Sequence, residues 1–178
     1  MMNVRNEYGR ALFLLAKEEG AIEKIKCDTQ TAADVLKNNP RYITLLDTPA
    51  LSKEERLALA DEAFGALHPT LKNLIKILTE KHLVYSFGDV CGTYLDMYNE
   101  EMGIEEVEAI TAIPMSDAQK ENMRAKLEAH TGKKIIITNT VDPTILGGVK
   151  IRYSGRQVDG SVKARLDAFA DSIKNIVI

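Results

Sequence analysis

Apolar side chains recur at helical spacing through the first hundred residues. In the first segment they follow an i, i+3, i+4, i+7 pattern, which predicts one buried stripe on a helix that Gly20 ends. These positions are Tyr8, Ala11, Leu12, Leu15 and Ala16. A second helix is expected over residues 21–37, where a similar stripe is formed by Ile22, Ile25, Ala32, Val35 and Leu36.

Residues typical of helix N-termini predict four more helices. Pro40 suits the first turn of a short third helix, and Ser52 with Glu55 forms a capping box that opens a fourth. His68-Pro69 opens a fifth, and a sixth runs from about residue 87 to 102, before Gly103. Six short helices joined by short loops predict an antiparallel bundle over residues 1–103.

After Gly103 the hydrophobic period changes from helical to alternating. Up to Pro114, an alternation with Glu106, Glu108 and Ile110 predicts a strand whose other side carries Val107, Ala109, Thr111 and Ile113. A capping box at Ser116 then leads a helix to Gly132, followed by strands over residues 133–141 and 149–154 and a turn at residues 154–155. A last helix carries a seam of Val162, Leu166, Phe169, Ile173 and Ile176. The fold expected is mainly α, with a small α/β domain over residues 104–178.

Composition narrows the classes of protein. At 178 residues, 45% hydrophobic and 28% charged, the chain has room for one ordinary globular domain or two small ones. A net charge of −3 argues against a nucleic-acid partner, and no apolar run approaches the roughly 20 residues that span a bilayer. The N-terminus carries early acids and no basic or small-residue signal, so a bacterial-type cytoplasmic protein is expected. Cys27 and Cys91 lack a CxxC partner and are expected to be buried or half-buried thiols.

The stretch DPTILGGVKIRYSGRQVDGSV poses the main question about chemistry, because glycine-rich loops bind phosphates in some proteins. Gly147-Gly148 precedes a strand and lacks the Gly-Lys-Ser/Thr ending of a phosphate loop, so a turn with close backbone approach is the expectation. Asp159-Gly160-Ser161 is interpreted as a tight turn plus a helix N-cap, with an anion at that helix start as the alternative.

No other pattern indicates catalysis. His68, His82 and His130 lie far apart with no metal-ligand spacing, and no serine has recognisable histidine and acid partners. We therefore expect no catalytic residue, no cofactor and no metal. Enzymes without such motifs exist, but long helical faces favour a protein that holds other proteins.

The C-terminal stretch carries a family resemblance. DPTILGGVKIRYSGRQVDGSVKARLDAF resembles the signature of the delta subunit of F-type ATP synthases, the family of the mitochondrial oligomycin-sensitivity-conferring protein. The matching positions are Asp142, Pro143, Gly147, Gly148, Arg152, Asp159, Gly160, Ser161, Val162 and Leu166. EYGRALFLLAKEEG is similar to the family's first helix, with Gly9 in place of the usual alanine, and Asn73-Leu74-Ile75 resembles its fifth.

The resemblance implies a peripheral-stalk subunit that acts as a stator, without an active site, on the cytoplasmic face of a bacterial membrane. Residues 1–103 would bind the N-terminal helix of an alpha subunit, and residues 104–178 the C-terminal end of the b-subunit stalk. The groove for the alpha helix carries over to Tyr8, Ala11, Leu12, Asn73 and Ile77. Leu12 equally fits the chain's own core, and Gly9 is expected to leave extra room in the groove.

Two other functions stay open at this point. One is a small nucleotide-binding protein or enzyme that uses the turns at Gly147-Gly148 and Asp159-Gly160. The other is a helical adaptor unrelated to the synthase. On the stalk side, Ile176 or Val177 of the last helix is the expected apolar contact.

Overall fold

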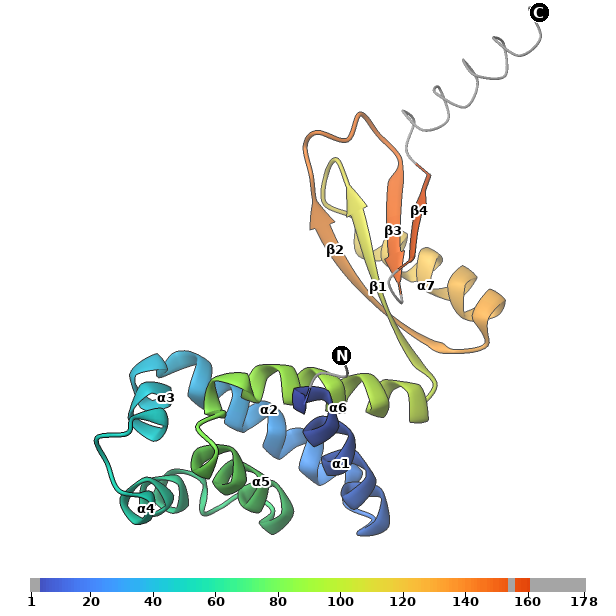
Figure 1. The fold of residues 1–178 in the computed structure, drawn as a ribbon. Helices are drawn as coiled ribbons and strands as arrows, with labels where there is room; N and C mark the ends of the chain where they lie inside the picture. The colour runs from blue at the N-terminus through green and yellow to red at the C-terminus, as the bar shows by residue number, and fades with distance from the viewer. Residues whose placement is uncertain (1–3, 154–155, 161–178) are drawn as a thin grey trace, which may run out of the picture. The chain divides into compact units, whose positions relative to one another are not determined.

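The chain divides into two compact units, Met1–Asn99 and Glu100–Ile178. A computed structural model describes residues 4–153 and 156–160. Across these residues the protein is mostly helical, with one small four-stranded mixed sheet in the second unit (Figure 1). The predicted last helix and the turn at residues 154–155 lie outside the described residues.

Helices make up the regular structure described in the first unit. They are α1 Val4–Glu18, α2 Ile22–Asn38, α3 Pro40–Asp47, α4 Lys53–Phe64, α5 Pro69–Glu80, the 3-10 turn η1 Val84–Ser86, and α6 Phe87–Glu101. Local signals set their starts, as the sequence predicts. Ser52 accepts from the Glu55 amide while the Glu55 side chain accepts from the Ser52 amide, which satisfies two free donors at once. Pro40 and Pro69 occupy first turns, where no amide donor is needed.

The core of the first unit centres on Tyr94 of α6. Its ring is fully buried and meets Phe13 of α1 edge to face, with centroids 5.6 Å apart. The Tyr94 hydroxyl donates to the Ile22 carbonyl of α2 at 2.9 Å, so its polar atom has a partner. Three helices are therefore tied together through this side chain.

The buried stripe of α1 differs from the predicted one. Gly9, Leu12, Phe13 and Ala16 face inward, whereas Leu15 is 45% exposed. These inward positions also follow the i, i+3, i+4, i+7 rule, so the true stripe is the predicted one turned by about one residue. A glycine adds nothing to a hydrophobic pattern, and the prediction missed it for that reason.

The expectation that Gly9 leaves extra room in a binding groove is wrong. A Cβ at Gly9 would meet the Thr93 Cβ at 2.6 Å and the Val90 carbonyl oxygen at 2.7 Å. The space that a side chain at Gly9 would need is thus occupied by the Thr93 side chain and the Val90 carbonyl of α6. Gly9 serves close packing of α1 on α6 and makes no room for a partner.

In α2, polar residues take inward positions that the prediction left out. Asp28 and Thr29 are buried, while Val35, predicted in the stripe, is exposed. The Asp28 carboxylate contacts Lys24 Nζ at 2.6 Å and accepts from the His68 amide at 2.8 Å, which fixes the start of α5 against α2. Cys27 faces outward, so the expectation of a buried or half-buried thiol is wrong there and confirmed for Cys91.

The second unit contains β1 Ile104–Thr111, α7 Asp117–Thr131, β2 Lys134–Val141, β3 Val149–Tyr153 and β4 Arg156–Asp159. The strand order is β2-β1-β3-β4, with β1 and β2 parallel and the other neighbours antiparallel. α7 connects the two parallel strands and packs over β2. Ser116 and Gln119 form the predicted capping box of α7, and Gly132 ends it with a φ of 68°.

Candidate protein-binding surfaces

α1 and α5 pack against each other in the first unit and share one outward surface. Thr70 Oγ1 at the start of α5 donates to both carboxylate oxygens of Glu19, each at 2.8 Å, just past the end of α1. Glu19 lies one turn after Leu15, and Thr70 lies one turn before Asn73. The hydrogen bond therefore brings the Leu15 side of α1 next to the Asn73 side of α5.

We call this surface the α1–α5 face. On α1 its residues are spaced i, i+3, i+7, and on α5 i, i+4, so each set occupies one side of its helix. The members are Tyr8, Ala11, Leu15, Asn73 and Ile77. Tyr8 is half-buried, Ala11 and Asn73 are exposed, and Ile77 is 42% exposed. Two adjacent helices thus present apolar side chains to the outside.

Leu12 and Leu15 differ in burial. Leu12, for which both the groove and the chain's own core were open, is only 2% exposed and belongs to the core beneath the face. Leu15, predicted to be core, lies on the face. Leu14 of the same helix is also exposed. The sequence does indicate an exposed apolar side on α1, because this helix has more large apolar residues than one buried stripe can contain.

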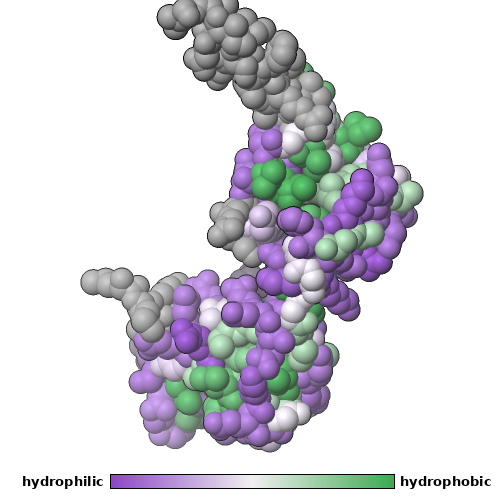
Figure 2. Space-filling model, turned by 90° about the vertical axis from the view of Figure 1, so that its right-hand side faces the viewer, coloured by the Kyte–Doolittle hydropathy of each residue, from purple (hydrophilic) through white to green (hydrophobic). Residues whose placement is uncertain are grey.

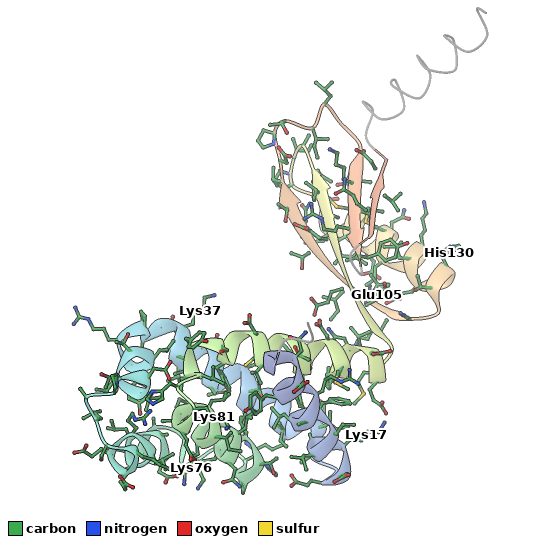
Figure 3. The ribbon with its side chains drawn as sticks, viewed as in Figure 1. Lys17, Lys37, Lys76, Lys81, Glu105 and His130 are labelled. Atoms are coloured by element: carbon green, nitrogen blue, oxygen red, sulfur yellow. The ribbon has the colours of Figure 1, made fainter. Side chains whose placement is uncertain are left out.

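Ion pairs hold the opposite edge of α5. Lys76 Nζ lies 2.6 Å from Asp61 of α4, and Lys53 of α4 lies 2.6 Å from Glu80 (Figure 3 labels Lys76). The Lys53 contact lowers the pKa of Glu80 below its usual value. α5 is therefore fastened to α4 on one side and to α1 through Thr70 on the other, which keeps the α1–α5 face in one shape.

In the second unit, the DPTILGG stretch is a built turn between β2 and β3. The Asp142 carboxylate accepts from the Thr144 hydroxyl at 2.7 Å and the Thr144 amide at 2.9 Å. Its own amide donates to the Thr111 carbonyl of β1 at 2.9 Å. Ile145 is then buried as an anchor, and Leu146 is 79% exposed.

Gly147 and Gly148 complete the turn with φ angles of 149° and 86°. The left-handed value at Gly148 strains any residue with a Cβ, which explains a glycine there. The chain continues directly into β3, so this loop does not itself open a helix. Pro143 also removes one amide donor from it. A phosphate cradle needs converging amides at a helix start, and this loop does not supply them.

Asp159 ends β4, opposite Lys150 of β3, and the Asp159 carboxylate lies 3.5 Å from Lys150 Nζ. The Gly160 amide donates to the Val149 carbonyl at 3.0 Å, so the chain leaves the sheet beside the start of β3. Ser161, the predicted N-cap, lies outside the described residues.

His68 and His82 flank the two ends of α5, and His130 lies on α7. His68 Nδ1 accepts from the Thr70 amide at 3.4 Å as the cap of α5, and His82 follows α5 with a φ of 55°. His130 is exposed in the last turn of α7 (Figure 3). Within the described ranges, no three His, Cys, Asp or Glu side chains gather in a way that could hold a metal ion. Across the same part of the chain, no helix is both long enough and apolar enough to cross a membrane.

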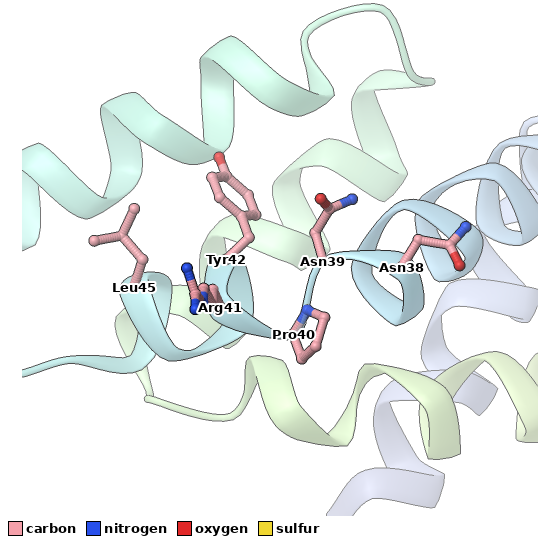
Figure 4. A pocket seen from close by; sticks show the side chains of 6 residues that line it. All are labelled: Asn38, Asn39, Pro40, Arg41, Tyr42 and Leu45. Carbon is pink, nitrogen blue, oxygen red and sulfur yellow. The ribbon is translucent and has the colours of Figure 1, made fainter.

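A shallow hollow of about 460 Å³ lies where α2 passes into α3 (Figure 4). Tyr42 lines it, and its hydroxyl donates away from it to the Leu59 carbonyl of α4 at 2.7 Å. Burial raises the Tyr42 pKa, and Glu62 adds to this. Arg41 is its only charged lining residue, so the hollow offers little for a specific ligand.

Comparison with known proteins gives one consistent result. The family described as ATP synthase delta (OSCP) subunit matches residues 4–173. The chain is 32% identical to ATP synthase subunit delta of Clostridioides difficile, over 99% of both chains. It is 30% identical to the same subunit of a Geobacillus species, over 92% of this chain and 93% of the relative.

The fold agrees with a solved structure as well. A chain of the Toxoplasma gondii mitochondrial ATP synthase hexamer superposes with a TM-score of 0.75 at 20% identity, over 97% of this chain and 98% of the other. The expected resemblance is confirmed by the sequence matches over almost the whole length. This protein belongs to the ATP synthase delta (OSCP) subunit family.

Proposed function

We propose that this chain is a peripheral-stalk subunit of a proton-translocating F-type ATP synthase and has no active site of its own. In this role it is a stator, at the cytoplasmic face of a bacterial membrane. Residues 1–103, as a six-helix domain, bind the N-terminal helix of an alpha subunit. Residues 104–178 hold the C-terminal end of the b-subunit stalk. Family membership supports the complex, and the α1–α5 face supports the mode of binding.

The single observation that carries this proposal is exposed apolar surface on two adjacent helices. Leu15 and Ile77 lie on the α1–α5 face, whose ends are fixed by the Thr70–Glu19 hydrogen bond. An amphipathic helix binds such a face through apolar residues spaced at i, i+3, i+4 and i+7. Such a contact suits a clamp, because the face is rigid before the partner arrives and little ordering entropy is lost.

Mechanically, the clamp resists torque. Ion flow turns the central rotor of the synthase, and the catalytic alpha–beta hexamer would turn with it unless a stalk held it. A subunit that binds the hexamer with one domain and the stalk with the other supplies this restraint. Such a role needs binding surfaces and no catalytic group. The nucleotide-binding alternative is not favoured, because the Gly147-Gly148 turn leads into a strand.

The test is calorimetric titration of the full chain with a peptide that copies the N-terminal helix of the alpha subunit from the same organism. We expect one-to-one binding. Ile77→Asp places a charge in the middle of the α1–α5 face and should weaken binding by about 30-fold, the effect of losing a roughly 2 kcal/mol hot spot. Leu45→Asp on α3 is the matched control, because Leu45 is similarly exposed on another helix.

Circular dichroism of both variants checks that the helices remain folded. Absence of binding to the unchanged protein at micromolar peptide would reject the proposed role of the first domain. Equal losses in Ile77→Asp and Leu45→Asp would reject the α1–α5 face as the site.

A further inference from the structure

Two glutamates lie at one end of the α1–α5 face. Glu18 is the last residue of α1, and Glu19 follows it. Glu18 comes three positions after Leu15 and seven after Ala11, so it lies on the side of α1 that carries the α1–α5 face. Both glutamates are exposed. In Figure 2 the first unit shows apolar patches, in green, that are bordered by hydrophilic residues, in purple. The apolar face therefore has a negatively charged end.

The position of Glu18 is unfavourable for α1 itself. The free carbonyl groups at the C-terminus of a helix carry partial negative charge, so an acid there opposes the helix dipole. Glu7 differs, because it lies in the first turn, where an acid is favourable. Lys17 is the favourable cation of the last turn, but it lies about 200° around the helix from Leu15 and thus away from the face. Helix stability therefore does not explain Glu18.

Glu19 adds a second carboxylate at the same end, in a fixed position. Both of its oxygens accept from the Thr70 hydroxyl at 2.8 Å, and His68 Nδ1 lies 3.8 Å from one of them. The Glu19 side chain is nevertheless 41% exposed. A carboxylate has about four lone-pair sites, so Glu19 can accept from a partner as well. Little ordering entropy is lost in that contact, because the side chain is already positioned.

The cations of this region have acidic partners on other elements. Lys24 Nζ lies 2.6 Å from Asp28, which also accepts from the amide that precedes α5. Lys72 Nζ of α5 lies 3.9 Å from Asp61 of α4. Within residues 4–153 and 156–160, no ion pair includes Glu18. The negative charge of Glu18 is thus left for a partner.

We infer that the helix bound by the α1–α5 face carries a lysine or arginine that contacts Glu18 and Glu19, beside an apolar seam that packs on Leu15 and Ile77. This inference rests on the proposed function, because it names the chemistry of the helix that the face binds. A charged contact at the rim of an interface mainly raises the association rate and excludes wrong partners. A helix with an acid at this position is rejected, because like charges would face each other.

Glu18→Lys tests the inference, because it acts on stability and on binding in opposite directions. A lysine suits the end of α1, so the thermal midpoint measured by circular dichroism should stay equal or rise. The affinity of the full chain for the alpha-subunit helix peptide should fall roughly 10-fold, mainly through slower association, and less at high salt. Surface plasmon resonance at two salt concentrations measures both quantities.

Glu62→Lys is the matched control, because Glu62 is exposed on α4 and its charge acts on Tyr42 of α3. It should change the affinity by less than about twofold. A rescue identifies the contact. Among peptides with one lysine or arginine replaced by glutamate, one should bind Glu18→Lys more tightly than it binds the unchanged protein.

The outcomes separate this inference from the proposed function. An unchanged association rate in Glu18→Lys, with binding still lost in Ile77→Asp, would overturn the inference and leave the proposed function standing. Weaker binding of Glu18→Lys together with a lower thermal midpoint would also overturn it, because the loss would then come from folding. Absence of peptide binding to the unchanged protein would reject the proposed function, and this inference with it.

Discussion

Gly9 of α1 lies against Thr93 of α6 so closely that a Cβ on Gly9 would be 2.6 Å from the Thr93 Cβ. The Val90 carbonyl oxygen would be 2.7 Å away on the same helix. Neither atom is the end of a flexible side chain, so relief requires the two helices to separate. The contact fixes which side of α1 faces inward and, through it, which residues form the α1–α5 face.

We predict that Gly9→Ala destabilises the first unit in spite of its better helix propensity. Alanine gains about 1 kcal/mol of propensity over glycine, while overpacking a tight contact costs about 1–3 kcal/mol. The net result should be a lower midpoint in urea unfolding followed by circular dichroism. Gly92→Ala on α6 is the control, because its Cβ meets nothing within 4 Å and only the favourable term remains. Equal stabilisation by both changes would contradict the clash.

Features set by neighbouring residues were predictable from the sequence. Both capping boxes, at Ser52 and Ser116, appear where three-residue spacing placed them. The alternation also predicted the buried side of β1 at Val107, Ala109 and Thr111, whereas Ile113 of the same pattern lies past the end of β1 and is 74% exposed. Each of these depends on a hydrogen bond or a period within one short segment.

Features set by distant residues were not predictable. The rotation of α1 depends on Gly9 meeting α6, about eighty residues away, and no local pattern records that contact. For the same reason Leu15 was assigned to the core and Cys27 to a buried position. The apolar hollow lined by Met123, Leu146 and Val149 was missed because these residues line one space only after the sheet forms.

A second prediction concerns Arg56, a buried cation on α4. Its Nη1 donates to the Thr79 carbonyl at 2.8 Å and the Leu46 carbonyl at 3.3 Å, joining α3, α4 and α5. Arg56→Met leaves both carbonyls without this donor, and we expect a loss of about 2–3 kcal/mol in the free energy of unfolding. Arg41→Met on the exposed side of α3 should change it by less than about 0.5 kcal/mol. Urea unfolding of both variants distinguishes them, and comparable effects would refute a role for the buried donor.

A third prediction concerns the pH dependence of the DPTILGG turn. The side-chain and then the backbone hydrogen bond from Thr144 lower the Asp142 pKa below 3.8, with a smaller contribution from Lys150. A depressed pKa in the folded state means that the carboxylate stabilises the turn above about pH 4. This stabilisation is lost as pH falls through the folded-state pKa.

Thr144→Val removes the hydroxyl donor and keeps the amide. We expect the Asp142 pKa to rise toward its ordinary value, measured by carboxyl carbon-13 titration in the full chain. Thr131→Val on α7 is the control, since Thr131 is exposed and its hydroxyl donates to the Leu127 carbonyl within its own helix. An unchanged Asp142 pKa in Thr144→Val would show that the hydroxyl contributes nothing to the turn.

The last prediction concerns the two cysteines, which differ in how far they are exposed to solvent. Cys91 is buried on α6, and burial raises the pKa of its thiol to about 12, whereas Cys27 is exposed on α2. The thiolate is the reactive form, so at pH 8 a disulfide reagent should modify one thiol per native chain and two after unfolding. Cys27→Ser should abolish the native reaction and Cys91→Ala should leave it unchanged.

Since the unfolded thiol ionises near pH 9, stability linked to Cys91 is present below that pH and falls as pH rises toward 12. Reaction of both thiols in the native protein at equal rates would mean that α6 opens locally, and the Tyr94-centred core would then be less closed than its contacts indicate.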